Sequence, residues 1–233
     1  MLPRTLEPEV MSDRDEAECY DKMDHAAVNR GFVDDLLAPG EFGSDVCDLG
    51  TGTALIPVEL CSRRPDIRVM AVDASSAMLD LAVYRIEVAA MRQRIHLCQA
   101  RVGALPFEDA FFDAVISNSL VHHLSEPALF FADCRRIGRG GALIFVRDLL
   151  RPSSAEEVEQ LVALHAANEP PQAQQLFRQS LHASLTLPEV QQLIEAAGLS
   201  AANLHASSDR HWTWSCRIES PTARTVLESG MRS

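Results

Sequence analysis

A glycine-containing loop, set directly between a buried strand and a helix, constrains this chain more than any other feature. The loop reads Gly50-Thr51-Gly52 and follows an apolar run that ends at Leu49. Glycines let the backbone turn sharply and approach a ligand closely, and the helix that follows offers free N–H groups at its first turn. A strand, a glycine loop and a helix in this order are typical of the first unit of a ligand-binding α/β sheet.

Two acidic residues indicate which ligand the loop holds. Asp73 ends the second strand, 23 residues after Gly50, where an acid can accept hydrogen bonds from both ribose hydroxyls. Asp48 precedes the loop, and its carboxylate repels a pyrophosphate but attracts an ammonium group. Position 55 is Leu55, so the third glycine of the dinucleotide fingerprint is absent. The pattern favours S-adenosylmethionine (SAM), which carries an ammonium group, over NAD; a glycine turn that only packs strand against helix is the structural alternative.

Strands and helices alternate through the middle of the chain. This order predicts parallel strands with right-handed crossovers, in a Rossmann-like doubly wound α/β sheet whose ligands lie beyond the carboxyl ends of the strands. The expected strands are 45–49, 67–72, 95–99, 112–117 and 141–147, and the expected helices are 53–63, 75–91 and 127–137.

The two ends of the chain extend this core. Apolar spacing predicts a helix over about 13–38, with a stripe of Val28, Phe32, Val33, Leu36 and Leu37. After Asp148 the pattern becomes helical, at 155–165, 173–181 and 187–197, and two late strands follow near 203–206 and 212–218. The predicted organisation is an N-terminal helical cap (1–40), the core (41–148), an inserted helical lid (149–185) and the C-terminal part of the sheet (186–233).

Composition excludes several classes of protein. The net charge is −12, from 21 basic and 33 acidic residues, and no basic face is visible, so we expect neither nucleic acid nor an anionic membrane as partner. No apolar run reaches the roughly 20 residues of a membrane span, and the acidic start lacks the pattern of a signal peptide. The six cysteines form no CxxC pair. We therefore expect a cytoplasmic protein, monomeric or homodimeric, without a disulfide framework.

The chain resembles the class I SAM-dependent methyltransferases, in particular the broad group that includes the quinone-biosynthesis enzymes. The resemblance covers roughly residues 40–148, and its motifs are specific as a set. It implies a seven-stranded sheet whose last strand is antiparallel, in agreement with the two late strands. The matching stretches are Asp48-Leu49-Gly50-Thr51-Gly52, Val72-Asp73-Ala74-Ser75-Ser76-Ala77-Met78-Leu79, the stretch from Leu105-Pro106-Phe107 to Asn118, and Leu120-Val121-His122-His123-Leu124.

The resemblance implies a cofactor role for nine residues. Asp48 would hold the methionine ammonium, Gly50, Thr51 and Gly52 would line the methionine and ribose, and Asp73 would bind the ribose hydroxyls. Ala74 and Met78 would flank the adenine, Val102 would pack on its ring, and Asn118 would lie near the methionine. The sequence departs from the family at Arg101, which cannot accept a hydrogen bond from the adenine amino group. Either a backbone carbonyl accepts it, or the match is displaced locally.

Candidates for the chemistry follow the fourth and fifth strands. His122 and His123 come after the fourth strand, and a histidine is suited to accepting a proton near neutral pH, although packing or capping is the alternative. Arg147 and Asp148 follow the fifth strand, with a surface ion pair as the alternative. We take His122 and Asp148 as candidate catalytic residues, and His123 and Arg147 as candidate substrate contacts.

The N-terminal segment adds two further candidates. In relatives this segment often folds over the cofactor, so we expect His25 as a catalytic residue and Tyr20 as a substrate contact, against the alternative of a solvated helix face. Trp212 and Trp214 lie two residues apart in a strand and therefore share a face, which we assign to the core. No metal is expected, because no HxH or HxxxH pair occurs and adjacent histidines should point in different directions.

These observations predict a SAM-dependent methyltransferase that acts on a small molecule, with S-adenosylhomocysteine (SAH) as the product. The sheet would hold the cofactor, while the lid and the N-terminal helix would select the acceptor. Methyl transfer is an in-line displacement, and it needs a base only when the nucleophile must lose a proton. The alternatives are a protein methyltransferase and a SAM-binding partner protein without activity; an NAD-dependent dehydrogenase is a distant fourth.

Overall fold

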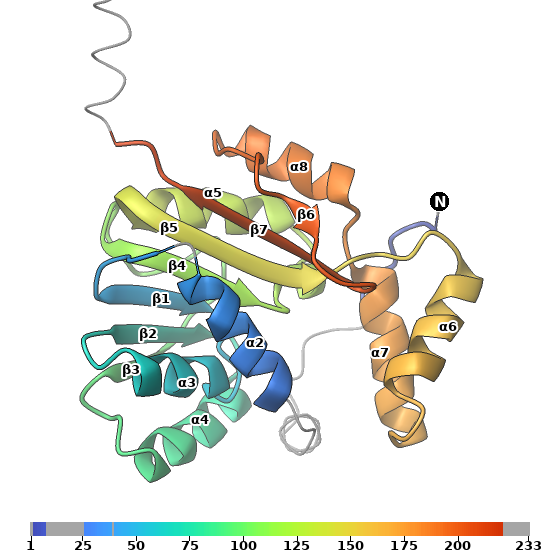
Figure 1. Ribbon diagram of the computed structural model, residues 1–233, viewed down its shortest axis with the longest axis horizontal. Helices are drawn as coiled ribbons and strands as arrows, with labels where there is room; N and C mark the ends of the chain where they lie inside the picture. The colour runs from blue at the N-terminus through green and yellow to red at the C-terminus, as the bar shows by residue number, and fades with distance from the viewer. Residues whose placement is uncertain (1, 8–25, 39, 221–233) are drawn as a thin grey trace, which may run out of the picture.

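The computed structural model describes residues 2–7, 26–38 and 40–220 of the chain, and a seven-stranded sheet lies at its centre (Figure 1). The strand order is β3-β2-β1-β4-β5-β7-β6, and β7 runs antiparallel to both of its neighbours. The predicted fold class is confirmed. The strands are β1 Asp45–Leu49, β2 Arg68–Asp73, β3 Ile95–Gln99, β4 Phe112–Asn118, β5 Gly138–Leu149, β6 His205–Ala206 and β7 His211–Arg217.

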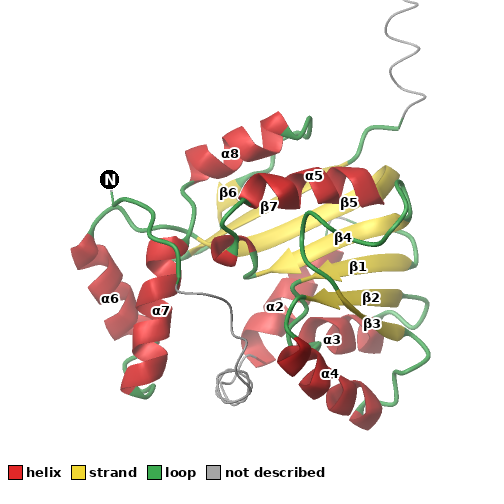
Figure 2. Ribbon diagram, turned by 180° about the vertical axis from the view of Figure 1, so that it is seen from behind, coloured by secondary structure: helices red, strands yellow, loops and turns green. Residues whose placement is uncertain are grey.

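Helices cover both faces of the sheet (Figures 1 and 2). On one face lie α2 (Ala26–Leu37), α3 (Leu55–Arg63) and α4 (Ser76–Val88). On the other lie α5 (Pro127–Ile137) and α8 (Leu187–Ala196). The described part of the predicted N-terminal helix is α2, and the first half of that prediction lies outside the described residues. Phe32, Val33 and Leu36 of the predicted stripe are fully buried, whereas Val28 is exposed.

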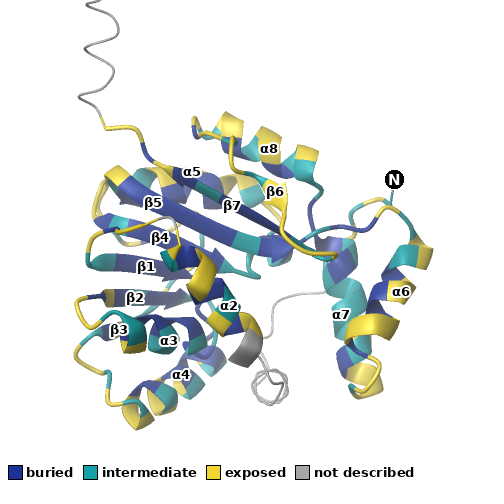
Figure 3. Cartoon of the chain, viewed as in Figure 1, coloured by how far each residue is buried: buried dark blue, intermediate teal, exposed yellow. Residues whose placement is uncertain are grey.

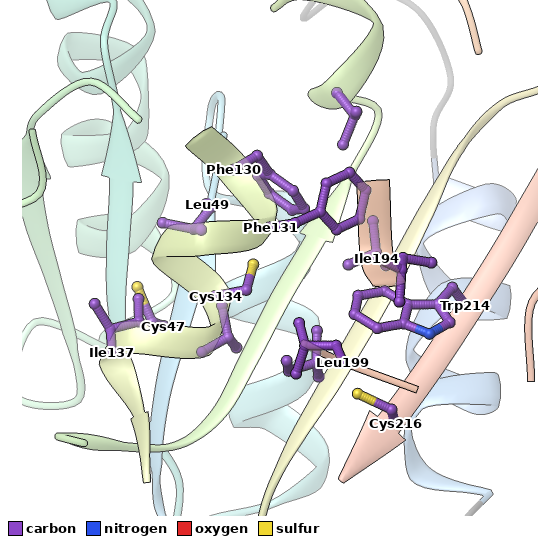
Figure 4. Close-up of a cluster of buried hydrophobic side chains, with 14 of the residues drawn as sticks. Cys47, Leu49, Phe130, Phe131, Cys134, Ile137, Ile194, Leu199, Trp214 and Cys216 are labelled. Carbon is purple, nitrogen blue, oxygen red and sulfur yellow. The ribbon is translucent and has the colours of Figure 1, made fainter. Parts of the chain in front are cut away.

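The alternation of side chains along the strands produces two cores. Val46 and Phe145 pack toward α2 and α3, while Cys47 and Ile144 pack toward α5 and α8. Figure 4 shows the second cluster, in which Trp214 lies beside the aromatic rings of α5. Both tryptophans are fully buried, so their assignment to the core is confirmed. Figure 3 shows the buried strands between partly exposed helices.

A helical hairpin follows β5 and stands beyond the carboxyl ends of the parallel strands (Figure 1). It consists of α6 (Ala155–His165) and α7 (Pro171–Ala183), as the apolar spacing predicts. Leu150 and Leu185 pair as a β-bridge at its base, so the hairpin leaves the sheet and returns to it at one place. Its own small core is built from Leu149, Val158, Leu161, Val162, Ala166 and Leu181.

The first described segment, residues 2–7, is not helical and packs against the hairpin. Leu2 N–H donates to the Ser153 carbonyl at 3.1 Å, and Thr5 N–H donates to that of His182 at 3.0 Å. The Arg4 guanidinium donates to the carbonyl of Ala183 at 2.6 Å. Within the described ranges, no helix has the length and apolarity needed to cross a membrane.

The aromatic cluster of α5 supports a stability prediction. Phe131 is fully buried, and its ring lies 5.2 Å from that of Phe130 and 5.7 Å from that of Trp214. We expect Phe131→Ala to lower the free energy of unfolding by about 3–5 kcal/mol, because it removes apolar burial and leaves a cavity. The control Tyr84→Ala, at a side chain 72% exposed, should change it by no more than about 0.5 kcal/mol. Urea denaturation measures both, and equal losses would contradict the prediction.

Candidate functional site

A cleft of about 650 Å³ lies between the carboxyl ends of the strands and the helical hairpin. Its volume falls within the usual range of small-molecule sites. The glycine loop and the strand ends form one side of the cleft, and α7 with the β6–β7 turn contributes to the other. All nine predicted cofactor residues line it: Asp48, Gly50, Thr51, Gly52, Asp73, Ala74, Met78, Val102 and Asn118.

The glycine loop turns tightly around the end of β2. The N–H groups of Gly50 and Thr51 both donate to the Val72 carbonyl at 2.9 Å. Gly50 has a φ of +73°, and a Cβ there would lie 2.9 Å from the side chain of Leu120. Only glycine meets both conditions without strain, so the sequence signal at this position has a direct structural cause.

The Asp73 carboxylate joins this loop to the start of α4. Its Oδ2 accepts a hydrogen bond from Gly52 N–H at 2.8 Å, and its Oδ1 accepts one from Ser75 N–H at 2.9 Å. Burial raises the pKa of Asp73, and these backbone hydrogen bonds oppose the rise. Each oxygen keeps a second lone pair, so the carboxylate can also accept hydrogen bonds from a diol in the cleft.

Asp48 is the more deeply buried of the two acids, with 1% of its surface exposed. Its Oδ2 accepts a hydrogen bond from the Thr51 hydroxyl at 2.7 Å. Burial raises the pKa of Asp48 to about 7; the Thr51 hydrogen bond opposes this rise and the charge of Asp73 adds to it. A cationic group bound in the cleft would therefore shift this carboxyl toward its ionised form.

His122 and Asp148 form a buried pair beside the cleft. Val121–His123 folds as a short 3-10 helix (η1), which the sequence did not predict. Asp148 Oδ1 lies 2.5 Å from His122 Nδ1, and Asp148 Oδ2 accepts a hydrogen bond from Val121 N–H at 2.6 Å. His122 lines the cleft but Asp148 does not. Asp148 therefore orients the ring, and Nε2 is the ring nitrogen left for a ligand.

The charges of this pair stabilise each other. Burial opposes the charged imidazolium, but the carboxylate of Asp148 outweighs it and raises the pKa of His122. Burial likewise opposes the charged carboxylate, but His122 outweighs it and lowers the pKa of Asp148. Each partner therefore favours the charged form of the other.

His123 lines the cleft beside His122 and pairs with Glu7 from the N-terminal segment. The Ser180 hydroxyl of α7 donates to the other oxygen of Glu7 at 2.6 Å. The two imidazole rings lie 4.0 Å apart, so the expectation that adjacent histidines diverge is wrong; the 3-10 turn brings them together.

Glu7, His122 and His123 offer ligand atoms within 4.8 Å of one another. They are the one group in the described ranges with the spacing of a metal site.

Of the three remaining candidates, the structure describes only Arg147. Arg147 does not line the cleft: it pairs with Asp35 of α2 at 2.5 Å and stacks on the ring of Phe32. The alternative of an ion pair is therefore the observed one. Tyr20 and His25 lie outside the described residues.

Sequence reasoning missed several residues of the cleft. Glu7 carried no signal, because its partners are more than 100 positions away. Arg210 and His211 lie in the turn before β7 and at its start, where no motif marks them. The helix expected at 173–181 was assigned to a lid that selects the acceptor, but none of its side chains was named as a contact. The residues of α7 that line the cleft are Ala173, Leu176, Phe177 and Ser180.

Comparisons with known proteins agree with this geometry. Residues 47–146 match the model of a family described as a methyltransferase domain. A demethylmenaquinone methyltransferase of Roseiflexus castenholzii is 30% identical over 117 residues, which are 50% of this chain and 47% of that protein. A malonyl-[acyl-carrier protein] O-methyltransferase of Hahella chejuensis is 29% identical over 136 residues, 58% of this chain and 47% of that protein. The chain spans less than half the length of the curated relatives it matches.

The fold is also similar to that of solved methyltransferase structures. A SAM-dependent methyltransferase of Aquifex aeolicus superposes with a TM-score of 0.67 at 16% identity, covering 88% of this chain and 98% of that one. The sheet and the cleft define a Rossmann-like ligand-binding domain. The family match over 47–146 and the shared fold confirm the predicted resemblance to the class I SAM-dependent methyltransferases.

The His122–Asp148 pair supports a prediction that needs no substrate. In Asp148→Asn, the pKa of His122 should fall, because the carboxylate that stabilises the imidazolium is lost while burial remains. NMR titration of the imidazole signals measures this shift. Asp209→Asn is the matched control, because Asp209 pairs with His165 and should leave His122 unchanged. An unaltered pKa in Asp148→Asn would contradict the assignment of the pair.

Proposed function

We propose that this protein transfers the methyl group of SAM to a small-molecule acceptor bound between the strand ends and the helical hairpin. The observation that carries the proposal is the position of two carboxylates: Asp48 and Asp73 lie at the carboxyl ends of neighbouring strands and line one cleft. The cleft continues past them toward apolar side chains of α7, and the proposal places the acceptor there.

The cofactor would lie across the glycine loop. In this arrangement the Asp48 carboxylate holds the methionine ammonium, and the Asp73 carboxylate accepts hydrogen bonds from the ribose hydroxyls. Ala74, Met78 and Val102 surround the adenine, and Asn118 lies near the methionine. Arg101 lines the same part of the cleft, so a backbone carbonyl is the acceptor that we assign to the adenine amino group.

The acceptor would occupy the side of the cleft nearer the hairpin. Leu176 and Phe177 offer an apolar wall, and the His122 ring lies between this wall and the cofactor loop in our proposal. If the nucleophile carries a proton, Nε2 of the neutral His122 ring accepts it. Asp148 holds the ring in the orientation that this requires and stabilises the imidazolium that forms. The hairpin excludes water, which protects the in-line displacement.

A small molecule suits this site better than a nucleic acid. The chain carries a net charge of −12, which repels a phosphate backbone. The named acceptors of the relatives differ, a demethylmenaquinone in one and a malonyl-[acyl-carrier protein] in another, so they do not define one acceptor atom. Turnover with a panel of thiols, phenols, amines and acids separates an enzyme from a SAM-binding partner protein.

The cofactor assignment predicts a loss of affinity in Asp73→Asn. The amide keeps one acceptor oxygen for the loop but loses the charge that strengthens hydrogen bonds from the ribose. We expect the Kd for SAH to rise about tenfold or more. Isothermal titration measures it, and Asp66→Asn, in the exposed turn before β2, is the control. Unchanged affinity in a folded Asp73→Asn protein would overturn the cofactor assignment.

The raised pKa of Asp48 predicts that the affinity for SAH depends on pH. Its pKa of about 7 means that its ionised fraction rises through pH 5.5–7.5, so SAH affinity should rise on the order of tenfold over this range. In the unliganded protein, the contribution of Asp48 to stability should show the opposite trend. Because its folded pKa lies above the unfolded one, ionisation of Asp48 favours the unfolded chain, so this contribution falls as pH rises from about 4 through 7.

The control for this prediction is Asp48→Asn, in which both trends should weaken together. Isothermal titration and thermal unfolding at matched pH values measure them. SAH affinity that stays level from pH 5.5 to 7.5 in the unaltered protein would argue against Asp48 as the ammonium ligand.

A further inference from the structure

Arg210 presents a cation to the cleft without a close partner. It lies in the turn between β6 and β7 and lines the cleft, and its side chain is 22% exposed. The nearest carboxylate in an ion pair with it is that of its neighbour Asp209, with 3.9 Å between Nη1 and Oδ1. Among the described residues, no hydrogen bond is made by its guanidinium.

The nearby acid is already engaged. Asp209 Oδ2 lies 2.6 Å from His165 Nε2, at the end of α6. Glu169 also lines the cleft, but it forms no ion pair with Arg210. The turn itself is held in place, because the Arg210 carbonyl accepts a hydrogen bond from Leu150 N–H at 2.8 Å and the Ser208 hydroxyl contacts His211 Nδ1 at 2.9 Å.

Two other arginines with little exposed surface are paired with carboxylates. Arg151, 6% exposed, lies 2.6 Å from a carboxylate oxygen of Glu189, and Arg147 lies 2.5 Å from one of Asp35. Taking a cation out of water without a partner is unfavourable. Burial lowers the pKa of Arg210, and only Asp209 opposes this. These surroundings favour a guanidinium that pairs with an anionic group of a bound ligand.

The residues around Arg210 indicate which kind of anion it can bind. Ala166 and Phe177 line the same cleft and offer apolar contact. His211 adds no charge near neutral pH, because burial and the charges of Arg210 and Arg147 lower its pKa to about 4. A single planar guanidinium matches a planar monoanion, whereas Glu169 and the net charge of the chain disfavour a dianionic phosphate.

We propose that Arg210 binds the carboxylate of the methyl acceptor, so that the acceptor is a small organic acid with an apolar body. This inference rests on the proposed function, because it takes the hairpin side of the cleft as the acceptor site. The apolar body packs against α7, and the carboxylate accepts two hydrogen bonds from the guanidinium.

Matched acid and amide pairs test the proposal on the full-length protein saturated with SAH. Isothermal titration would compare benzoate with benzamide, phenylacetate with phenylacetamide, and octanoate with octanamide. We expect at least one acid to bind about tenfold more tightly than its amide. Arg210→Gln should bring the two affinities within about twofold, and Arg210→Lys should retain part of the preference.

Arg101→Gln is the control, because it removes the same charge from the cofactor side of the same cleft and should leave the acid preference intact. Saturation with SAH allows the proposed function and the role of Arg210 to be tested separately. A protein that does not bind SAH would overturn the proposed function and this inference with it. A protein that binds SAH but shows no acid preference, or keeps it in Arg210→Gln, would overturn this inference alone, as would loss of SAH affinity in Arg210→Gln.

Discussion

The carboxylate of Asp73 ties the glycine loop to the neighbouring strand, and the rest of the site depends on this contact. It accepts hydrogen bonds from Gly52 and Ser75, while the Val72 carbonyl accepts two more from the loop. These bonds hold the turn at the edge of the sheet where parallel strands end. The same acid that would bind a ribose therefore also builds the loop that surrounds it.

A second carboxylate performs a similar task on the other half of the sheet. Asp148, at the end of β5, holds the 3-10 turn after β4 through Val121 and His122. Arg4 then adds the first segment of the chain, donating to carbonyls of His122 and Leu124 as well as to the hairpin. The wall of the cleft is thus assembled from segments far apart in the chain, each held by charged or backbone hydrogen bonds.

The position of Arg147 shows the limit of what a sequence pattern predicts. The end of β5 was expected to face the cleft, but successive side chains of a strand point to opposite faces. Arg147 shares its face with Leu143 and Phe145, which pack toward α2, and it therefore meets Asp35 and Phe32 there. Asp148 points the other way, toward η1. Alternation alone separates the two residues, although the sequence does not say which face the cleft adjoins.

The sequence by itself determined the order of strands and helices, the glycine turn and the two acids beside it. These are local properties: hydrophobic periodicity, the freedom of glycine at positive φ, and the end of a strand. Only the tertiary structure decided that Glu7 meets His123, that Asp148 orients His122 and that Arg210 faces the cleft. Such contacts join residues that the chain does not place near each other, and their charges acquire meaning only through burial, which no local pattern contains.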